Sequence, residues 1–562
     1  MMSESWESIE SVEPREADTP FDYAYDVVVV GTGGAGFATA MGAADEGMSV
    51  LMVESTDKWG GSTAMSGGGL WLPDNPLMKR DGVGDSRDEA LAYLEATVGD
   101  AGRATSRERK EAFVDGVADL VTTAEKYGMV FTRAADYPDY YPELPGGKIG
   151  RAIEAKPIDA KTIGPWRRSI RTSALMPVKT DDVWLMQRSW STPAGFVRGA
   201  EVALRMLGSV VRGQRLAGIG AALTTSFLKA VVGKLGVPLW LNAPLRSLIV
   251  EDGRVVGVRV MRSGRSVTVG ASRGVMLAAG GFDHNTEWRQ KYHGIEGAPS
   301  GNPGNLGQAI AIAQSAGAAV ELMDDAWWGA SVAAPPGHDP SFIVGERALP
   351  YSILVDACGE RFANESESYV DLGHHMLEHD RDGAFWLVAD ARHARRYLRT
   401  FAMDPRLTKA MAQAGIMAKA ATLEELATKL DIEPARLRAT VDRFNGFARS
   451  GVDGDFGRGN SAYDRYYGDP TVHPNPCLGP LEKGPFTAFR VVVGDLGTKG
   501  GILTDADARA LREDATAIEG LYAAGNSSAS VMGRTYPGPG STIGPATVFG
   551  LRAARHMGQM NG

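Results

Sequence analysis

The chain has 562 residues, of which 44% are hydrophobic and 23% charged, the balance of an ordinary globular protein with room for two sizeable cores. With 59 basic and 68 acidic residues its formal charge is −9, which argues against nucleic acid as the main partner. The only cysteines are Cys358 and Cys477, so a disulfide framework is excluded and a reducing, cytoplasmic compartment is expected.

Residues 1–21 are acidic and contain no apolar run. They therefore match neither a signal peptide nor a membrane span. We expect them to form a disordered leader.

The segment from Tyr25 to Glu54 has the pattern of a complete βαβ unit. Val27–Val30 is typical of a buried parallel strand, an Ala-rich helical stretch follows, and Val50–Val53 is a second apolar run. The turn between strand and helix is rich in glycine, which suits a tight turn, close approach to a pyrophosphate, and helix packing. Glu54 is placed to accept hydrogen bonds from a ribose. We predict a dinucleotide site at Gly31, Gly33, Ala35, Gly36 and Glu54.

A second loop rich in glycine and serine follows at residues 55–69. A nicotinamide-binding domain has no need of it, whereas a larger, bent cofactor would use a second contact surface. We therefore predict FAD, with further contacts from Ser55, Gly61, Ser62, Thr63, Ser66, Gly67 and Gly68.

Residues 74–130 have helical patterns and are predicted to form scaffold helices. The segment DYPDYYPE at 136–143 contains two prolines, so its tyrosines are expected on an irregular loop. From the residues alone, these phenols fit either packing or a site.

Residues 160–235 are unusually basic and amphipathic. On a helix from Phe196 to Val211, apolar residues gather on one side, while Arg198, Arg205 and Arg212 recur every seventh residue on the other. Two interpretations remain open: a helix that covers the core, or one that lies on an anionic membrane surface, giving a peripheral location on the inner face of the cell membrane. The run from Leu216 to Val232 is too short and interrupted to span a bilayer.

From residue 237 onward the pattern returns to strands. Three short strands are predicted at 248–250, 255–260 and 267–269, with hairpin turns at Asp252-Gly253 and Ser263-Gly264. A separate strand from Val275 ends in glycines, which suits another backbone approach to the cofactor. Near the C-terminus a glycine turn precedes a closing helix, whose positive N-terminus suits the reduced flavin. These segments add Ala279, Gly280, Gly525, Asn526, Thr542 and Ile543 to the predicted site.

Motifs along nearly the whole chain from residue 22 carry a specific resemblance: VVVVGTGGAG, GGSTAMSGGGLWLP, DYPDYYPE, DDAWWG, GERFANESESY, GDLGTKGG and GRTYPGPGSTIGPA. The chain resembles the 3-ketosteroid Δ1-dehydrogenases, within the fumarate reductase and succinate dehydrogenase flavoprotein group. The longer, side-chain-tolerant members are the most similar. The resemblance implies an α/β fold in which a Rossmann-like FAD-binding domain, residues 22–295 and 495–562, is interrupted by an α+β catalytic domain, residues 296–494.

By this resemblance, Tyr369 is the base at carbon 2 of the steroid and Tyr140 supports it. Tyr536 and the Gly540 N–H hold the carbon 3 carbonyl, and FAD takes hydride from carbon 1. Because the pKa of a free tyrosine is near 10, we expect Tyr369 to be tuned by its partner or its surroundings. The implied partners are a 3-ketosteroid and a quinone-like or other electron acceptor.

The glycine-serine loop has no histidine, so FAD is expected to be bound without a covalent link. A dehydrogenase acting at the Δ4 position of 5α-ketosteroids is an alternative. A fumarate reductase-like flavoprotein is another, although Arg534 is the only basic residue in the TYPG region, where a dicarboxylate needs several. An electron carrier without its own substrate would leave the tyrosines unexplained.

Overall fold

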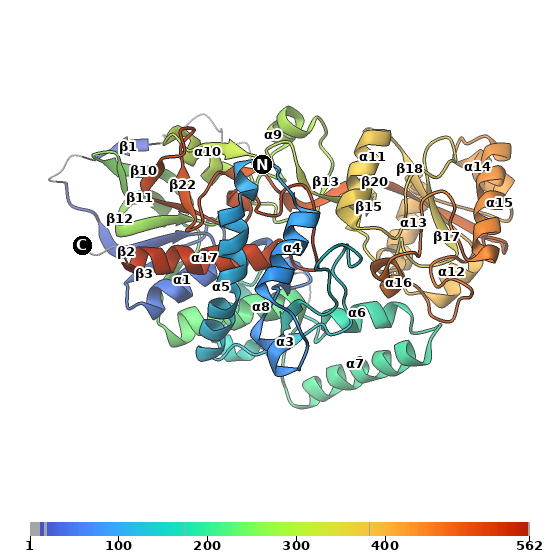
Figure 1. Ribbon diagram of the computed structural model, residues 1–562, viewed down its shortest axis with the longest axis horizontal. Coiled ribbons are helices and arrows are strands. Elements are labelled where there is room, and N and C mark those ends of the chain that lie inside the picture. The colour runs from blue at the N-terminus through green and yellow to red at the C-terminus, as the bar shows by residue number, and fades with distance from the viewer. Residues whose placement is uncertain (1–11, 16–18, 173–174, 382, 560–562) are drawn as a thin grey trace.

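Two mixed β-sheets with their helices form the two halves of the computed structural model, which describes residues 12–15, 19–172, 175–381 and 383–559 (Figure 1). In this part of the chain, one sheet has nine strands: β1 (Val12–Pro14), β10 (Leu245–Glu251), β11 (Arg254–Arg262), β12 (Arg265–Leu277), β2 (Tyr23–Val30), β3 (Val50–Val53) and β9 (Leu239–Trp240), with β23 (Ala517–Ala523) beside β12 and β22 (Arg509–Leu511) beside β23. The other has seven: β16 (Ser341–Phe342), β15 (Ala326–Val332), β20 (Phe486–Thr498), β18 (Phe385–Ala389) and β17 (Ser352–Val355), with β13 (Ala298–Pro299) and β19 (Met417–Ala420) beside β20. The predicted α/β class is confirmed.

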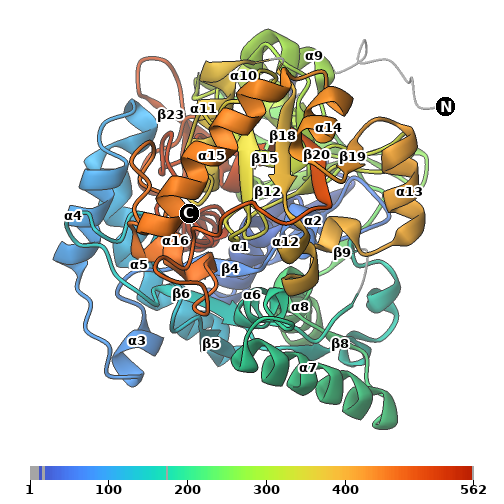
Figure 2. The same ribbon diagram turned by 90° about the vertical axis from the view of Figure 1, so that its right-hand side faces the viewer.

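The helices belong mainly to one half or the other (Figures 1 and 2). On the nine-stranded side lie α1 (Gly34–Asp45), α3 (Pro76–Arg80), α4 (Arg87–Thr97), α5 (Arg107–Lys126), α8 (Ile219–Leu228), α10 (Gln308–Ser315) and α17 (Ile543–Gln559). On the seven-stranded side lie α11 (Tyr369–His379), α12 (Ala391–Arg396), α13 (Pro405–Gln413), α14 (Leu423–Lys429), α15 (Pro434–Ser450) and α16 (Ala462–Tyr467). A small sheet of β4 (Gly69–Trp71), β6 (Ala152–Ala155) and β5 (Phe131–Arg133) belongs to the first side.

The predicted βαβ unit is present as β2, α1 and β3, with β2 and β3 paired in parallel from Val27↔Val50 to Val30↔Val53. Because side chains alternate along a strand, Val27 and Val29 enter one core cluster, and Val28 and Val30 enter another on the opposite face of the sheet. Both faces are buried, which is why the strand is a continuous apolar run.

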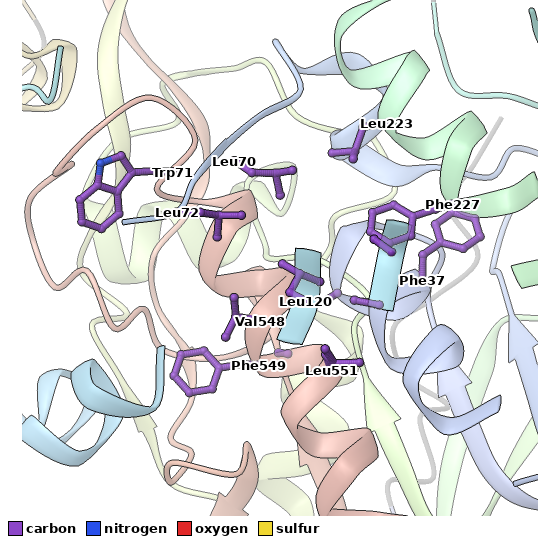
Figure 3. Packing of buried hydrophobic residues seen from close by; sticks show 14 of the residues in the cluster. Phe37, Leu70, Trp71, Leu72, Leu120, Leu223, Phe227, Val548, Phe549 and Leu551 are labelled. Atoms are coloured by element: carbon purple, nitrogen blue, oxygen red, sulfur yellow. The ribbon is translucent and has the colours of Figure 1, made fainter. Parts of the chain in front are cut away.

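Helix α1 is buried along most of its length because other helices as well as the sheet cover it. Phe37 stacks on Phe227 of α8 with a ring separation of 6.0 Å, and Leu551 of α17 contacts the other side (Figure 3). A Cβ at Gly42 would lie 2.5 Å from Leu551 Cδ1. The small residues of α1 therefore set how closely α17 approaches.

The predicted hairpins at Asp252-Gly253 and Ser263-Gly264 are confirmed, with all four residues at positive φ. The division of the following segment into two strands was wrong. β12 runs without interruption from Arg265 to Leu277, with a register shift between Ala271 and Gly274 where it passes from pairing with the start of β2 to pairing with its end. An irregularity of this kind breaks the alternation of residues by which strands are recognised in a sequence.

The leader prediction was partly wrong. Val12–Pro14 form β1, which pairs in parallel with β10, and the Glu13 carboxylate accepts a 2.8 Å hydrogen bond from Arg259 Nε. Phe21 packs against Gly257 and Gly270. Residues 1–11 and 16–18 lie outside the described residues.

The expected domain boundary at residue 296 does not follow the two cores. Ile310 and Ile312 of α10 pack with Val28 and Val30 beneath the nine-stranded sheet, although they come after residue 296. β13, at 298–299, pairs instead with β20 of the second sheet. The chain therefore crosses between the halves more than once before β15.

The basic segment at 160–235 folds into several elements, including α6 (Thr180–Gln187), α7 (Pro193–Val211) and the buried α8. No helix among the described residues is both long and apolar enough to cross a bilayer. Figure 2 shows α7 at the margin of the molecule.

The interpretation of α7 as a helix that covers the core requires its apolar side to face the protein, but its basic side does so. Arg198 and Arg205 turn inward to the buried carboxylate of Asp182 on α6, at 2.8 and 2.6 Å. The apolar side points outward. Its exposed side chains, at 54 to 79%, are Phe196, Val197, Leu204, Leu207, Val210 and Val211.

Candidate active site

A cavity of about 450 Å³ lies between the two halves and is lined from both. Every residue predicted from the sequence for the site lines it except Gly36. A Cβ at Gly36 would lie 2.2 Å from the Gly31 carbonyl oxygen, so this glycine allows the helix to pack on the preceding turn and does not face a ligand.

One end of the cavity is built from the β2–α1 turn. Gly31 has a φ of +105°, and a Cβ there would lie 2.2 Å from the Ala278 carbonyl oxygen, so only glycine fits. Gly33 precedes α1 and has no side chain to cap the helix. The Gly34 N–H donates to Thr63 Oγ1 at 3.0 Å, and the N–H groups that follow it in the first turn are left for a phosphate. The buried Glu54 carboxylate accepts a 2.6 Å hydrogen bond from Thr32 and a 3.2 Å one from Ser55.

The glycine-serine loop is fixed by residues that the sequence reasoning missed. Ser62 Oγ accepts hydrogen bonds from the Asn302 N–H at 2.9 Å and from Asn305 Nδ2 at 3.0 Å. Asn305 also donates to Asp283, whose pKa is raised by burial and by the neighbouring Asp495. The NPGN turn at 302–305 was the available signal, but nothing in it shows which loop it contacts.

The opposite end of the cavity is formed by three buried tyrosines from three distant segments. The ring of Tyr140 lies 5.5 Å from that of Tyr369 and 5.2 Å from that of Tyr536, and the latter two are 4.9 Å apart. Their exposed fractions are 5% or less, so the loop at 136–143 buries the Tyr140 phenol and does not display it.

Two buried interactions hold the tyrosine loop in place. The Asp139 carboxylate accepts a 2.7 Å hydrogen bond from the Trp71 indole and pairs with Arg151 at 2.8 Å. The Tyr140 N–H donates to the Pro537 carbonyl oxygen at 2.9 Å. Tyr140 is therefore tied directly to the loop that carries Tyr536.

Gly540 has a φ of +98°, and a Cβ there would lie 2.3 Å from the Gly69 carbonyl oxygen. Only glycine can occupy this position next to the glycine-serine loop. Burial raises the pKa of Tyr536, and hydrogen bonding by Thr542 and the Gly540 backbone opposes the rise; the Tyr536 hydroxyl lies 3.0 Å from Thr542 Oγ1. The Gly540 N–H and the Tyr536 hydroxyl are therefore neighbours, as two donors to one carbonyl oxygen must be.

The surroundings of Tyr369 act against the tuning expected for a base. Burial, followed by the neighbouring Tyr536, raises the pKa of Tyr369 well above its usual value. Burial raises the pKa of Tyr140 as well. The Tyr140 hydroxyl lies 3.4 Å from that of Tyr137, a residue missed although it belongs to the same motif.

The cavity also contains a carboxyl group that the sequence reasoning missed. Glu154 on β6 is 2% exposed, and its Oε2 accepts hydrogen bonds from the Thr180 N–H at 2.9 Å and the Thr180 hydroxyl at 3.0 Å. Burial raises its pKa to about 7. A lone acid in the apolar run AIEA was a signal for it.

No Lys, Arg, His or Cys is among the described residues that line the cavity. Arg534 turns away from it and pairs with Asp324 at 2.9 Å, near the surface. Trp184, Phe342, Val344 and Leu496 supply apolar surface near the tyrosines. The tyrosine end of the cavity is therefore suited to an uncharged, apolar molecule carrying a carbonyl group.

Comparisons with known proteins agree with this geometry. Residues 26–543 match the FAD binding domain family. The chain is 44% identical to a 3-oxosteroid 1-dehydrogenase of Mycolicibacterium smegmatis, covering 94% of this chain and 96% of that one. It is 43% identical to one of Mycobacterium tuberculosis, over 96% and 99%.

A solved structure of a related dehydrogenase also matches this chain. The crystal structure of a 3-ketosteroid Δ1-dehydrogenase from Sterolibacterium denitrificans, in complex with 1,4-androstadiene-3,17-dione, matches with a TM-score of 0.88. The two are 37% identical, and the match covers 96% of this chain and 100% of the other.

Proposed function

Because the chain belongs to the FAD-binding family of 3-oxosteroid 1-dehydrogenases, we propose that it introduces the double bond between carbons 1 and 2 of 3-ketosteroids in steroid breakdown. The observation that carries the proposal is the grouping of Tyr369, Tyr536 and Gly540 at one end of a cavity without cationic side chains among its described residues. The glycine-lined end fits FAD, because it combines a helix N-terminus preceded by glycine with a buried acid.

Each residue at the tyrosine end has a defined task in this proposal. The Tyr536 hydroxyl and the Gly540 N–H donate to the carbon 3 carbonyl, and Tyr369 takes the proton from carbon 2. As the proton leaves, negative charge develops on the carbonyl oxygen, so the two donors stabilise the transition state more than the bound steroid. Bound FAD supplies, at flavin N5, the acceptor for the hydride that leaves carbon 1. Tyr140 supports Tyr369 through their packed rings.

Anaerobic titration tests the reaction. Androst-4-ene-3,17-dione or cholest-4-en-3-one should bleach the bound flavin and yield the Δ1 product, identified by mass spectrometry. Bleaching by 5α-steroids alone would indicate the Δ4-(5α)-dehydrogenase alternative. Bleaching by succinate would indicate a fumarate reductase-like activity, for which the described cavity lining offers no cation to hold two carboxylates.

The proposal includes non-covalent FAD, because no histidine or cysteine is found among the described cavity residues to attach it. It also includes a quinone-like acceptor for the electrons. Rapid oxidation of the steroid-reduced protein by a short-chain quinone, compared with oxygen, tests the acceptor; equal rates would remove the quinone from the proposal.

The proposal further includes peripheral association with membrane through α7, with the cytoplasmic location predicted from the cysteines. Its support is the exposed apolar side of α7, since an isolated apolar helix face in water is unfavourable by about 1.5–3 kcal/mol for each large side chain. Trp184 on α6 lines the cavity, and α6 packs on α7. A water-insoluble steroid could then pass from lipid to the cavity beside these helices.

A further inference from the structure

Two sequence motifs have no role in the mechanism above, DDAWWG at 324–329 and GDLGTKGG at 494–501. The structure joins them through a buried ion pair. Lys499 Nζ lies 3.1 Å from Asp325 Oδ2, and the exposed fractions of the two side chains are 0 and 1%. The Lys499 N–H also donates to the Asp325 carbonyl oxygen at 3.1 Å.

Asp325 is held from a second side by His374 of α11, whose Nε2 lies 2.8 Å from Oδ1. Burial raises the pKa of Asp325, but Lys499 and His374 together outweigh it and lower this pKa to about 2. Burial lowers the pKa of Lys499, and Asp325 opposes that shift. Removing one member of the pair would leave a buried charge uncompensated.

Trp327 lies between this ion pair and the proposed catalytic tyrosines. The Lys499 ammonium is 5.1 Å from the centre of its ring. The indole N–H donates to Asn526 Oδ1 at 3.3 Å, and the ring meets Tyr536 edge to face at 5.3 Å and 90°. Trp327 itself is only 2% exposed.

We propose that Trp327, fixed by the Asp325–Lys499 pair, is a positioning residue that sets the Tyr536 phenol and the Asn526 side chain against the bound steroid and flavin. The inference rests on the proposed role of Tyr536. Tyr140 and Tyr369 also touch the Tyr536 ring, but both line the cavity, whereas Trp327 does not. Trp327 therefore supports Tyr536 from outside the cavity. Without it, the phenol can move away from the place where a carbonyl oxygen must sit.

The next residue on β15 provides a matched control. Trp328 is 1% exposed, belongs to a separate core cluster, and has the Arg289 guanidinium 5.6 Å from its ring, in a buried pair with Asp495. It resembles Trp327 in size, burial and neighbouring cation, but its ring meets His293 at 4.9 Å, whereas that of Trp327 meets Tyr536. A purely structural role would make the two tryptophans equivalent.

The experiment compares Trp327→Leu, Trp328→Leu, Tyr536→Phe and the double variant Trp327→Leu/Tyr536→Phe as holoenzymes. We expect Trp327→Leu to lower kcat about 10- to 100-fold with little change in KM, because misplacement by about 1 Å costs this much. We expect the double variant to be no slower than Tyr536→Phe, because both changes remove the same contribution. Trp328→Leu should lower Tm similarly without this loss of kcat.

A second readout does not depend on turnover. Trp327→Phe keeps a ring edge near Tyr536 but removes the N–H donated to Asn526. Binding of FAD to the stripped protein, followed by flavin fluorescence, should weaken several-fold in Trp327→Phe and remain unchanged in Trp328→Phe.

The outcomes separate this inference from the proposed function. Losses of kcat that multiply in the double variant, or equal losses in Trp327→Leu and Trp328→Leu, would overturn the positioning role alone. Turnover by Tyr536→Phe at the wild-type rate would overturn the role of Tyr536 and, with it, that of Trp327.

Discussion

At the scale of single residues, the phenol of Tyr369 presents the main chemical problem, because burial moves its pKa away from the range of a useful base at neutral pH. We predict that kcat/KM of the wild type rises with pH and reaches no plateau below about pH 10. Tyr369→Phe should lose at least about 10²- to 10³-fold in kcat, and Tyr140→Phe should lose less. Steady-state kinetics from pH 6 to 10 give both results.

Tyr141→Phe is the control for these variants. Tyr141 lies on the same loop, but its hydroxyl donates to Asp371 at 2.9 Å and it does not line the cavity. It should keep the wild-type profile. Near wild-type turnover by Tyr369→Phe would mean that the carbon 2 proton leaves through another group.

Glu154 gives a prediction about stability. Its pKa is raised from 4.5 to about 7, mainly by burial, with Asp181 raising it further and Thr180 and Lys179 opposing this. The folded state therefore holds this proton more tightly than the unfolded chain. The tightly held proton on Glu154 therefore stabilises the folded state fully below pH 4.5. This stabilisation is lost as pH rises through 7, which lowers the free energy of unfolding by about 3 kcal/mol.

Glu154→Gln removes that titration and keeps an acceptor for Thr180. Denaturant unfolding at pH 5 and pH 8 should show a smaller decrease in stability with pH for the variant than for the wild type. Identical pH dependence in both proteins would show that Glu154 titrates normally.

At the scale of elements, α7 makes the membrane proposal testable. We predict that Leu204→Gln/Leu207→Gln/Val211→Gln abolishes flotation with liposomes while turnover of soluble steroids is kept, since the replaced side chains are 61 to 79% exposed. Val130, Met403 and Val452, exposed at 55 to 63% away from α7, give the control triple variant. Equal flotation of the two triples would contradict the proposal. Charge reversal at Arg198 or Arg205 is unsuitable because it would break the contacts with Asp182.

The same helix shows where sequence reasoning reached its limit. The spacing of its apolar residues identifies two faces but does not say which face meets the protein. The buried Asp182 on a different helix decides that, and no periodicity within α7 reports it. By contrast, the βαβ unit and the two-residue hairpins were predictable, because their turn glycines and strand valines determine the structure locally.

At the scale of the whole molecule, the tyrosine site was predictable only through family resemblance. Tyr140, Tyr369 and Tyr536 are separated by more than 160 residues from one segment to the next, and only the fold brings them together. Local patterns also could not reveal three other contacts between segments that are distant in sequence. These are Asn305 with Ser62, α10 with the first sheet, and Trp327 with Tyr536.

The position of the cavity between the two halves predicts how FAD affects stability. Acid or heat should release free FAD into the supernatant, because no histidine or cysteine lines the described cavity. Added FAD should raise the unfolding temperature of the stripped protein as one transition, because residues of both halves line the cavity. Flavin that stays with the precipitated polypeptide, detected by absorbance, would show a covalent bond.

The ion pairs of Arg198 and Arg205 on α7 with Asp182 on α6 limit how the protein can be shortened. Removing α7 to obtain a more tractable enzyme would leave the Asp182 carboxylate, now wholly buried, without Arg198 and Arg205. The cost is at most about 3–5 kcal/mol, the value for a charge that stays buried without a partner, and this is a large share of the stability of a typical domain. A useful truncation must therefore replace Asp182 by a neutral residue in the same step, so that the helix and its counter-charge are removed as one unit.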